Sequence, residues 1–271
     1  MRSMLLKNSL LLITLTCLII ACTKVPFTNR KQVTGLYSTD QILEMSYQAY
    51  QTVLDSVPLS NDEDQVAMVK RVGANIQAAA EQLLAEKGQT GALAGFEWDY
   101  NLIQNDTLVN AWCMPGGKVA FYTAILEICE DETGVAVVMG HEIAHAIAKH
   151  GQERINQGAI TNTALNIGSV ALGQNPSLGE KLIFYGMGYG SQFGMLKFSR
   201  THESESDEIG LYLMAAAGYD PKEAPMFWER MSAGGQEPPE FLSTHPNHST
   251  RVADLERLMP KAMAYYEASQ K

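Results

Sequence analysis

The segment GHEIAH at residues 140–145 constrains the fold of this chain more than any other part of the sequence. An α-helix turns about 100° per residue, so side chains four positions apart lie on one face. His141 and His145 can therefore present imidazole nitrogens to one metal ion, while Glu142 projects beside them, near enough to polarise a water molecule. Apolar neighbours predict that these groups are partly buried, and buried polar groups need partners. The pattern predicts a zinc site of the HExxH type, with Glu142 as general base.

The third metal ligand does not come from the residues directly after the motif. A catalytic zinc ion takes three protein ligands and keeps one position open. The pattern HExxHxxGxxH fails here, because Ala148 and Gly151 stand where it has glycine and histidine. His150 follows His145 by five residues, which turns it away from the metal face of a continuous helix. We expect His150 to lie behind the site or at the surface.

Two acidic residues downstream offer a better third ligand. Glu203 and Asp207 share one face of a helix predicted over residues 200–217. Glu203 could bind the metal while Asp207, one turn further on, accepts a hydrogen bond from a ligand histidine. A solvent-exposed acidic helix face has the same spacing, and spacing alone does not separate the two interpretations. His202 and His248 are expected at the surface.

The hydrophobic periodicity predicts an α+β fold that is mostly helical, with a small antiparallel sheet beside the HExxH helix. Turn signals separate three predicted strands at residues 96–98, 107–113 and 119–122. The predicted helices cover residues 41–55, 62–86, 123–129, 131–152, 200–217, 221–233 and 248–268. The Gly-rich, apolar residues 157–196 fit a helical hairpin, a lid or a membrane-contacting surface equally well.

The first 21 residues predict a lipoprotein signal peptide. A short basic segment precedes an apolar run over residues 10–20, which is too short to span a bilayer. Residues 19–22 (IIAC) resemble a bacterial lipobox, so we expect Cys22 to be lipidated and residues 22–37 to form an irregular, lipid-anchored arm. Thr23 at the next position favours the outer membrane, on the side that faces the periplasm.

The charge of the chain excludes one class of partner. It has 30 acidic and 20 basic residues among 271, a net charge of −10, and no run rich in lysine or arginine. Because phosphate binding needs clustered positive charge, nucleic acid is not expected as a partner. Cys113 and Cys129 could pair in an oxidising compartment, but two small buried hydrophobic residues are the favoured interpretation.

The motifs together resemble the HtpX/BepA/Oma-type metallopeptidases, which are gluzincins. The resemblance rests on HEIAH at 141–145, on Glu203 and Asp207, and on the segments VNA at 109–111, PGGK at 115–118, AGYDP at 217–221 and THP at 244–246 followed by Arg251. It covers nearly all of residues 95–260. Ser206 departs from the pattern, which usually has alanine before the aspartate. The chain ends soon after its last helix, so it resembles short, single-domain lipoprotein members without a tetratricopeptide domain, and residues 38–271 are expected to form one zinc metallopeptidase domain.

The resemblance implies roles for individual residues. It makes Glu203 the third zinc ligand and Asp207 its supporting hydrogen-bond acceptor, and it places Asn110 and Ala111 on an edge strand that pairs with an extended substrate. His245 would approach the zinc ion, where it either stabilises the oxyanion or caps the metal in a latent state.

The expected function is zinc-dependent hydrolysis of peptide bonds in unfolded or misassembled cell-envelope proteins. One Zn²⁺ per chain is the expected cofactor, and unfolded or extended polypeptides and the membrane are the expected partners. Two alternatives remain: an envelope protein that holds zinc and binds clients without cutting them, and a protease kept latent by His245. The sequence indicates neither the substrate nor the oligomeric state.

Overall fold

The computed structural model describes residues 22–35, 37–157, 198–233, 241–242, 245 and 250–271. The predicted signal peptide, nearly all of the Gly-rich segment 157–196, and His248 lie outside the described residues.

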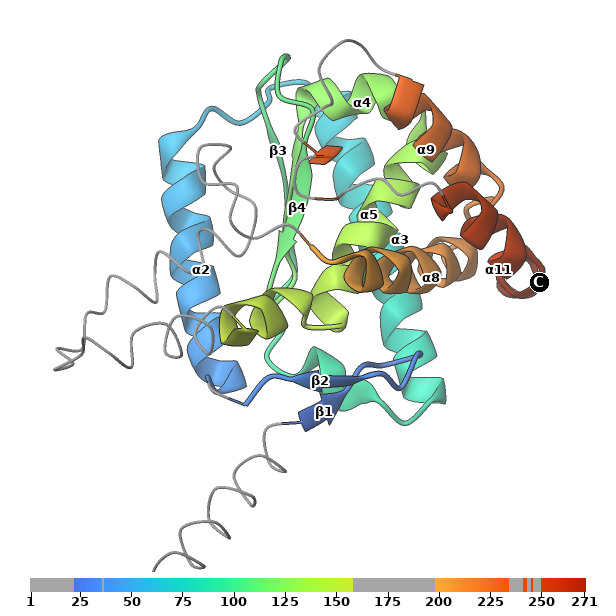
Figure 1. Cartoon of the computed structure of the whole chain (residues 1–271). Helices are drawn as coiled ribbons and strands as arrows, with labels where there is room; N and C mark the ends of the chain where they lie inside the picture. Colours follow the sequence, from blue (N-terminus) through green and yellow to red (C-terminus); the bar gives the residue numbers. More distant parts are fainter. Residues whose placement is uncertain (1–21, 36, 158–197, 234–240, 243–244, 246–249) are drawn as a thin grey trace, which may run out of the picture.

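A three-stranded sheet runs through the middle of the molecule (Figure 1). Its strands are β3 (Asp99–Ile103), β4 (Ala111–Met114) and β5 (Lys118–Tyr122), in the order β3-β5-β4. β4 is antiparallel to β5, as predicted, but β3 is parallel to it. The prediction of a wholly antiparallel sheet is therefore wrong: the chain reverses twice between β3 and β5, and β5 is inserted between its two predecessors. The first strand also begins three residues later than the predicted 96–98 segment.

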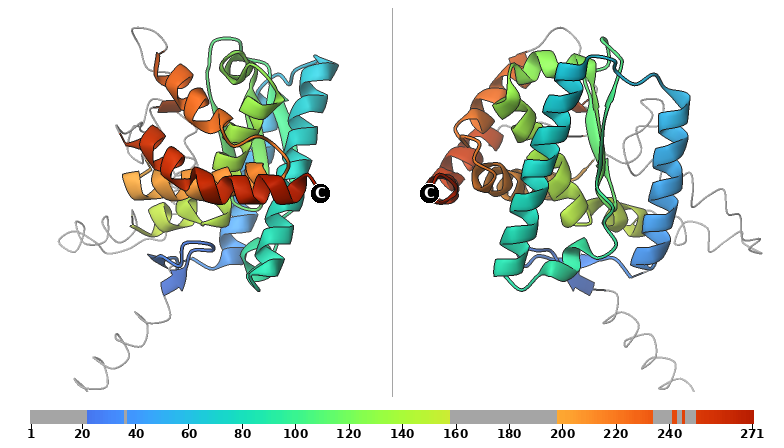
Figure 2. Two further views of the ribbon diagram at one scale, coloured as in Figure 1. Left: turned by 90° about the vertical axis from the view of Figure 1, so that its right-hand side faces the viewer. Right: turned by 180° about the vertical axis from the view of Figure 1, so that it is seen from behind.

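Helices cover both faces of this sheet, which confirms the α+β, mostly helical fold class (Figures 1 and 2). Along β5, Val119 and Phe121 point into the larger core, while Ala120 and Tyr122 point into a smaller core beneath α2 (Thr39–Ser56). This alternation is what a strand buried on both faces requires. The larger core lies among α3 (Glu63–Glu86), α4 (Thr123–Cys129), α5 (Glu132–Ile147), α8 (Arg200–Ala216), α9 (Glu223–Ala233) and α11 (Arg251–Ser269).

The helices α5 and α8 cross at two glycines, Gly140 and Gly210. A Cβ atom added at Gly210 would lie 2.8 Å from the carbonyl carbon of Gly140 and from the backbone nitrogen of His141. Only glycine permits so close an approach of two helix backbones. The crossing brings the face of α8 that carries Glu203 against the HExxH motif of α5.

The HExxH helix is shorter than predicted. Asp131 caps its start, as expected, by accepting hydrogen bonds from the backbone N–H groups of Thr133 and Gly134. The helix ends at Ile147 instead of continuing to residue 152, because Lys149 adopts a left-handed conformation with φ of 56°. A second helical segment begins at residue 150 and runs through 157 in a new direction.

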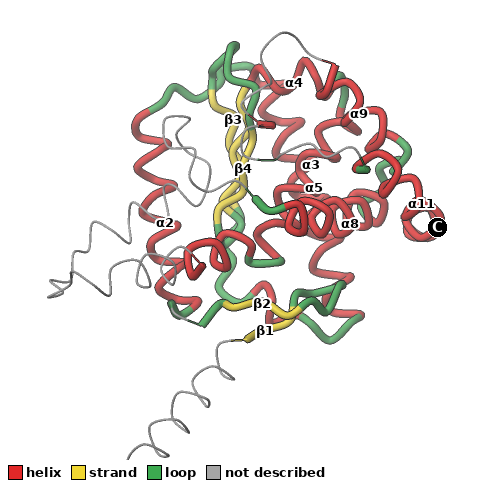
Figure 3. The backbone as a smooth tube through the Cα atoms, in the orientation of Figure 1, coloured by secondary structure: helices red, strands yellow, loops and turns green. Residues whose placement is uncertain are grey.

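The N-terminal arm is ordered into a hairpin rather than irregular. β1 (Cys22–Lys24) pairs antiparallel with β2 (Lys31–Val33), beneath the helical part of the molecule (Figure 3). The 3₁₀ helix η1 (Thr90–Leu93) lies in the segment between α3 and β3. Among the described residues, no helix is both long enough and apolar enough to cross a bilayer.

Candidate metal centre

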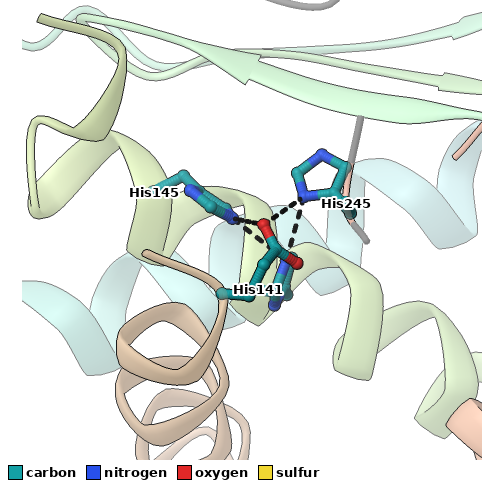
Figure 4. A group of neighbouring side chains, drawn as sticks. His141, His145 and His245 are labelled. Carbon is teal, nitrogen blue, oxygen red and sulfur yellow. Dashed lines mark hydrogen bonds and ion pairs between the residues drawn. The ribbon is translucent and has the colours of Figure 1, made fainter. Parts of the chain in front are cut away.

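Four buried side chains converge at the crossing of α5 and α8. The nearest nitrogen or oxygen atoms of His141, His145, Glu203 and His245 all lie within 4.8 Å of one another. Nε2 of His141 is 3.1 Å from Nε2 of His145 and 3.3 Å from Nδ1 of His245. Figure 4 shows the three imidazole rings directed toward one point. The HExxH motif, α8 and the His245 loop thus contribute to a single centre.

Glu203 is the only carboxylate in this group of four. Its Oε1 atom lies 3.4 Å from Nε2 of His145 and 3.1 Å from Nδ1 of His245. Burial opposes ionisation of Glu203, but the neighbouring histidines outweigh it and hold the pKa of this carboxyl well below its usual range. Its Oε2 atom accepts no hydrogen bond from the described part of the chain. Nη1 of Arg251 lies 3.3 Å from this oxygen, and a metal ion would add a further partner for the buried carboxylate.

The spacing of these atoms fits a tetrahedral zinc ion. With zinc–ligand bonds of about 2.0–2.1 Å, neighbouring ligand atoms lie about 3.3 Å apart. Five of the observed separations between candidate ligand atoms are 3.1 Å to 3.6 Å, and all of them lie within 4.8 Å. The donor set of three imidazoles and one carboxylate is also one that zinc accepts. His145 is suited to metal binding because burial lowers its pKa and keeps its ring neutral.

His141 is held from behind by a carboxylate. Its Nδ1 atom lies 3.0 Å from Oδ1 of Asp207, whose Oδ1 also accepts a hydrogen bond of 2.6 Å from Nη2 of Arg251. Arg251 is fully buried and stacks over the ring of Trp228, 3.2 Å from the ring centroid. Burial disfavours protonation of His141, but the hydrogen bonds of Asp207 and Glu203 raise its pKa to about 9. The structure therefore places Asp207 in the position that the sequence predicts.

His145 is held by His150, and of the two positions expected for this residue the structure shows the one behind the site. Nδ1 of His150 lies 2.9 Å from Nδ1 of His145, and its Nε2 lies 2.9 Å from Oε2 of Glu205. His150 is completely buried, and it reaches His145 because the turn at Lys149 redirects the chain. His202, expected at the surface, is also buried: it stacks on His150 and contacts Glu153. The acidic residues at 203–208 are equally typical of a solvent-exposed helix face, so they gave no signal of this second set of contacts.

Glu142 lines a largely apolar cavity on the other side of the centre. Its Oε1 atom makes no hydrogen bond in the described part of the chain and lies 3.5 Å from Nε2 of His245. Burial raises the pKa of Glu142, although His245 and His141 oppose the shift. A raised pKa suits a carboxylate that must take up a proton during a reaction.

Asn110 and Ala111 stand at the start of β4, and both line the same cavity. Among the strands that the structure describes, β4 lies at the edge of its sheet, because it pairs with β5 on one side only. The cavity wall is otherwise largely apolar, with Ile42, Leu43, Phe96 and Trp112 among the residues that line it. The two remaining cysteines do not pair with each other: Cys113 and Cys129 are both free thiols.

Comparison with known proteins identifies the family. The model of peptidase family M48 matches residues 70–259. The mitochondrial metalloendopeptidase OMA1 of Schizosaccharomyces pombe is 32% identical over 251 residues, which cover 90% of this chain and 68% of that protein. OMA1 of Arabidopsis thaliana is 36% identical over 186 residues, 67% of this chain and 36% of the relative. The beta-barrel assembly-enhancing protease of Escherichia coli is 27% identical over 223 residues, 80% of this chain and 43% of the relative.

These matches confirm the resemblance to the Oma and BepA types. This chain spans only part of each of these relatives, from about a third to about two thirds of their length. The match to the family model nevertheless covers more than half of the 271 residues. The chain therefore belongs to peptidase family M48 and is classed with these metalloendopeptidases.

Proposed function

We propose that this protein is a zinc-dependent endopeptidase that cleaves extended segments of unfolded or misassembled cell-envelope proteins. The observation that carries the proposal is the position of Glu142. Its buried carboxylate stands between the four-residue centre and an apolar cavity that one edge strand borders. A purely structural zinc site needs neither a general base nor a substrate cavity.

His141, His145 and Glu203 would hold the zinc ion. When bound, zinc supplies Lewis acidity, which acidifies water and polarises the scissile carbonyl group. Glu142 then takes a proton from the attacking water and passes it to the leaving nitrogen. The raised pKa of Glu142 favours the first transfer, since the carboxyl can then hold the proton until the leaving nitrogen takes it.

The edge strand β4 supports the choice of substrate. An extended peptide can add to its free side through main-chain hydrogen bonds, beginning beside Asn110 and Ala111. Such pairing reads the main chain, so it selects unfolded segments rather than a particular sequence. The apolar cavity beside the strand accommodates the large apolar side chains that folded proteins bury and unfolded proteins expose.

The proposed location is the periplasmic side of the outer membrane, with a lipid anchor at Cys22. The lipobox-like segment 19–22 supports the anchor, and Thr23 supports the choice of membrane. The similarity to a relative named beta-barrel assembly-enhancing protease supports an envelope role.

Casein cleavage by the purified chain in detergent tests the activity. Wild type and Glu142→Gln are compared with and without a zinc chelator, and bound zinc is measured in both. We expect the chelator to abolish cleavage, and Glu142→Gln to bind zinc but lose at least about a hundredfold in rate, since general-base catalysis contributes that much. Zinc binding without any cleavage by the wild type or by His245→Ala would favour the client-binding alternative.

A latent form of the same enzyme is favoured by one further observation. Nδ1 of His245 lies among the candidate ligand atoms, 3.1 Å from Oε1 of Glu203, where it can occupy the position that a catalytic zinc keeps open. If His245 caps the metal, His245→Ala should cleave casein faster than the wild type. If His245 stabilises the oxyanion instead, the variant should be slower or unchanged.

A further inference from the structure

A buried cluster of charged and aromatic side chains lies behind His145, and the proposed reaction uses none of it. It consists of His150 and Glu153 from the helical segment 150–157, His202 and Glu205 from α8, and Arg30 from the N-terminal hairpin. Four of the five residues are 6% exposed or less. Ionisable groups are almost never buried this deeply unless they are paired, as they are here.

The hydrogen bonds of this cluster define which ring nitrogens carry protons. Nε2 of His145 faces the other candidate ligands, so the proton of a metal-binding neutral ring stands on Nδ1. That N–H group donates to Nδ1 of His150, 2.9 Å away. His150 must then carry its own proton on Nε2, where it donates to Oε2 of Glu205 at 2.9 Å. Glu205 can only accept, so it fixes both rings in the forms that leave Nε2 of His145 free for a metal.

Arg30 holds Glu205 in place from outside the catalytic helices. Its Nε atom donates to Oε2 of Glu205 at 2.7 Å, and its two terminal nitrogens donate to the carboxylate of Glu153 at 3.1 Å and 2.8 Å. The hydroxyl of Thr28, in the same turn, donates to Oε1 of Glu205. A planar guanidinium bridges two carboxylates in a way that a single ammonium cannot.

Ser206, the residue that departs from the family pattern, also contacts this cluster. Its hydroxyl oxygen lies 3.2 Å from Nδ1 of His150, and the side chain is completely buried. An alanine at this position would leave that contact empty. The residue that differs from the pattern therefore touches the histidine that supports His145.

We propose that Arg30, Glu205 and His150 form a positioning relay that orients His145 for the metal, so that metal affinity depends on docking of the N-terminal hairpin. The inference rests on the proposed function, because it takes His145 as a metal ligand. It assigns a task to the hairpin, whose first strand begins at Cys22, the predicted lipidation site. The relay then connects the end of the chain that carries the predicted lipid anchor with the metal centre.

The full-length chain carrying Arg30→Gln tests the relay, with Arg71→Gln as matched control. Arg71 also donates from Nε and Nη2 to one carboxylate, that of Glu132, but this pair lies at the surface, far along α3 from the hairpin. Zinc affinity is measured by competition with a chromophoric chelator, and kcat and KM are measured on casein. We expect Arg30→Gln to bind zinc about tenfold or more weakly, as loss of an outer contact to a metal ligand does. KM should stay unchanged, and Arg71→Gln should match the wild type.

Two substitutions of His150 supply an independent check. His150→Leu removes both hydrogen bonds of the relay, whereas the amide of His150→Gln can accept from His145 and donate to Glu205. We expect the glutamine variant to recover much of the zinc affinity that the leucine variant loses. If His150→Leu does not fold, the zinc affinities of Arg30→Gln and Arg71→Gln decide whether the relay exists.

The outcomes separate the relay from the proposed function. A wild type that binds zinc and cuts casein, together with a folded Arg30→Gln variant of equal zinc affinity, would overturn the relay alone. A rise in KM without loss of zinc affinity would overturn it as well, because the hairpin would then act on the substrate. A wild type that binds no zinc would overturn the proposed function and the relay with it.

Discussion

The two histidines of the HExxH motif are supported in different ways. His141 contacts the carboxylate of Asp207 directly, and Arg251 closes that contact from the C-terminal helix α11. His145 contacts a second histidine, His150, and is separated by two further contacts from Arg30 in the N-terminal hairpin. Each end of the described chain thus contributes an arginine to one of the two supports.

The two supports differ in the number of contacts and in the solvent exposure of the arginine at which each ends. The support of His141 takes two contacts and ends at an arginine whose side chain is 0% exposed, against the ring of Trp228. The support of His145 takes three contacts and ends at an arginine whose side chain is 24% exposed. Breaking a short, fully buried series of charged contacts costs more stability than breaking a partly exposed one, because no water can replace the missing partner. We therefore expect the Asp207 side to be rigid and the Arg30 side to be adjustable.

The largest effect is expected from Asp207→Ala. The substitution removes the acceptor for Nδ1 of His141 and leaves Glu203, 3.3 Å away, as the one carboxylate that pairs with Arg251 among the described residues. Zinc affinity should fall by about 10- to 100-fold, and the free energy of unfolding should fall by about 3–5 kcal/mol, the usual cost of breaking a buried ion pair. Chelator competition and urea unfolding measure the two quantities.

Asp254→Ala is the control for this substitution. Asp254 pairs with Arg257 at the surface of α11, so its loss should change stability by no more than about 1 kcal/mol. The comparison between the two supports would be reversed if Arg30→Gln weakened zinc binding more than Asp207→Ala does.

A smaller effect, common to both supports, is expected from Gly210→Ala. The added methyl group would meet backbone atoms of Gly140 and His141 at 2.8 Å, so α8 must move away from α5. Overpacking of this kind costs about 1–3 kcal/mol, and because α8 carries Glu203, Glu205 and Asp207, zinc affinity should fall as well. Gly151→Ala is the control, since a Cβ there meets no atom within 4 Å. Equal thermal stability of the two variants would show that the helix crossing does not depend on glycine.

The sequence predicted the support of His141 but left that of His145 open, with His150 either behind the site or at the surface, for a physical reason. Asp207 could be predicted because Glu203 and Asp207 are one helical turn apart, and the helix that carries them is regular over its whole length. The contact between His150 and His145 could not be predicted, because the prediction continues the HExxH helix through residue 152. In the structure, Lys149 turns the chain with a φ of 56°. Nothing in the residue types at 147–151 marks a left-handed lysine, and glycine is usual in that conformation.

The same limit applies to the sheet. The change of hydrophobic period and the preceding turn signal indicated that residues 119–122 form a strand, and this strand is confirmed as part of β5. These signals carry no information on strand order or direction, so the parallel pairing of β3 with β5 could not be predicted from them. Likewise, Arg30 stood in a segment predicted to be irregular, and its two carboxylate partners lie more than a hundred residues away along the chain.

The smallest effect is expected from Glu153→Gln, and it depends on pH. Burial opposes ionisation of Glu153, but His202 and Arg30 outweigh it and lower its pKa from 4.5 to about 2. A carboxyl whose pKa is lower in the folded state contributes stability above its unfolded pKa, and loses that contribution as the pH falls through the folded value. The wild type should therefore lose more stability than Glu153→Gln between pH 4.5 and pH 2, and the variant should be the less stable of the two at pH 7.

Thermal unfolding across this range measures the difference, with Glu132→Gln as the control, whose more exposed pair with Arg71 should give a weaker pH dependence. Equal slopes for Glu153→Gln and the wild type would mean that the outer end of the Arg30 cluster is open to water, and that the His145 support is anchored by Glu205 alone.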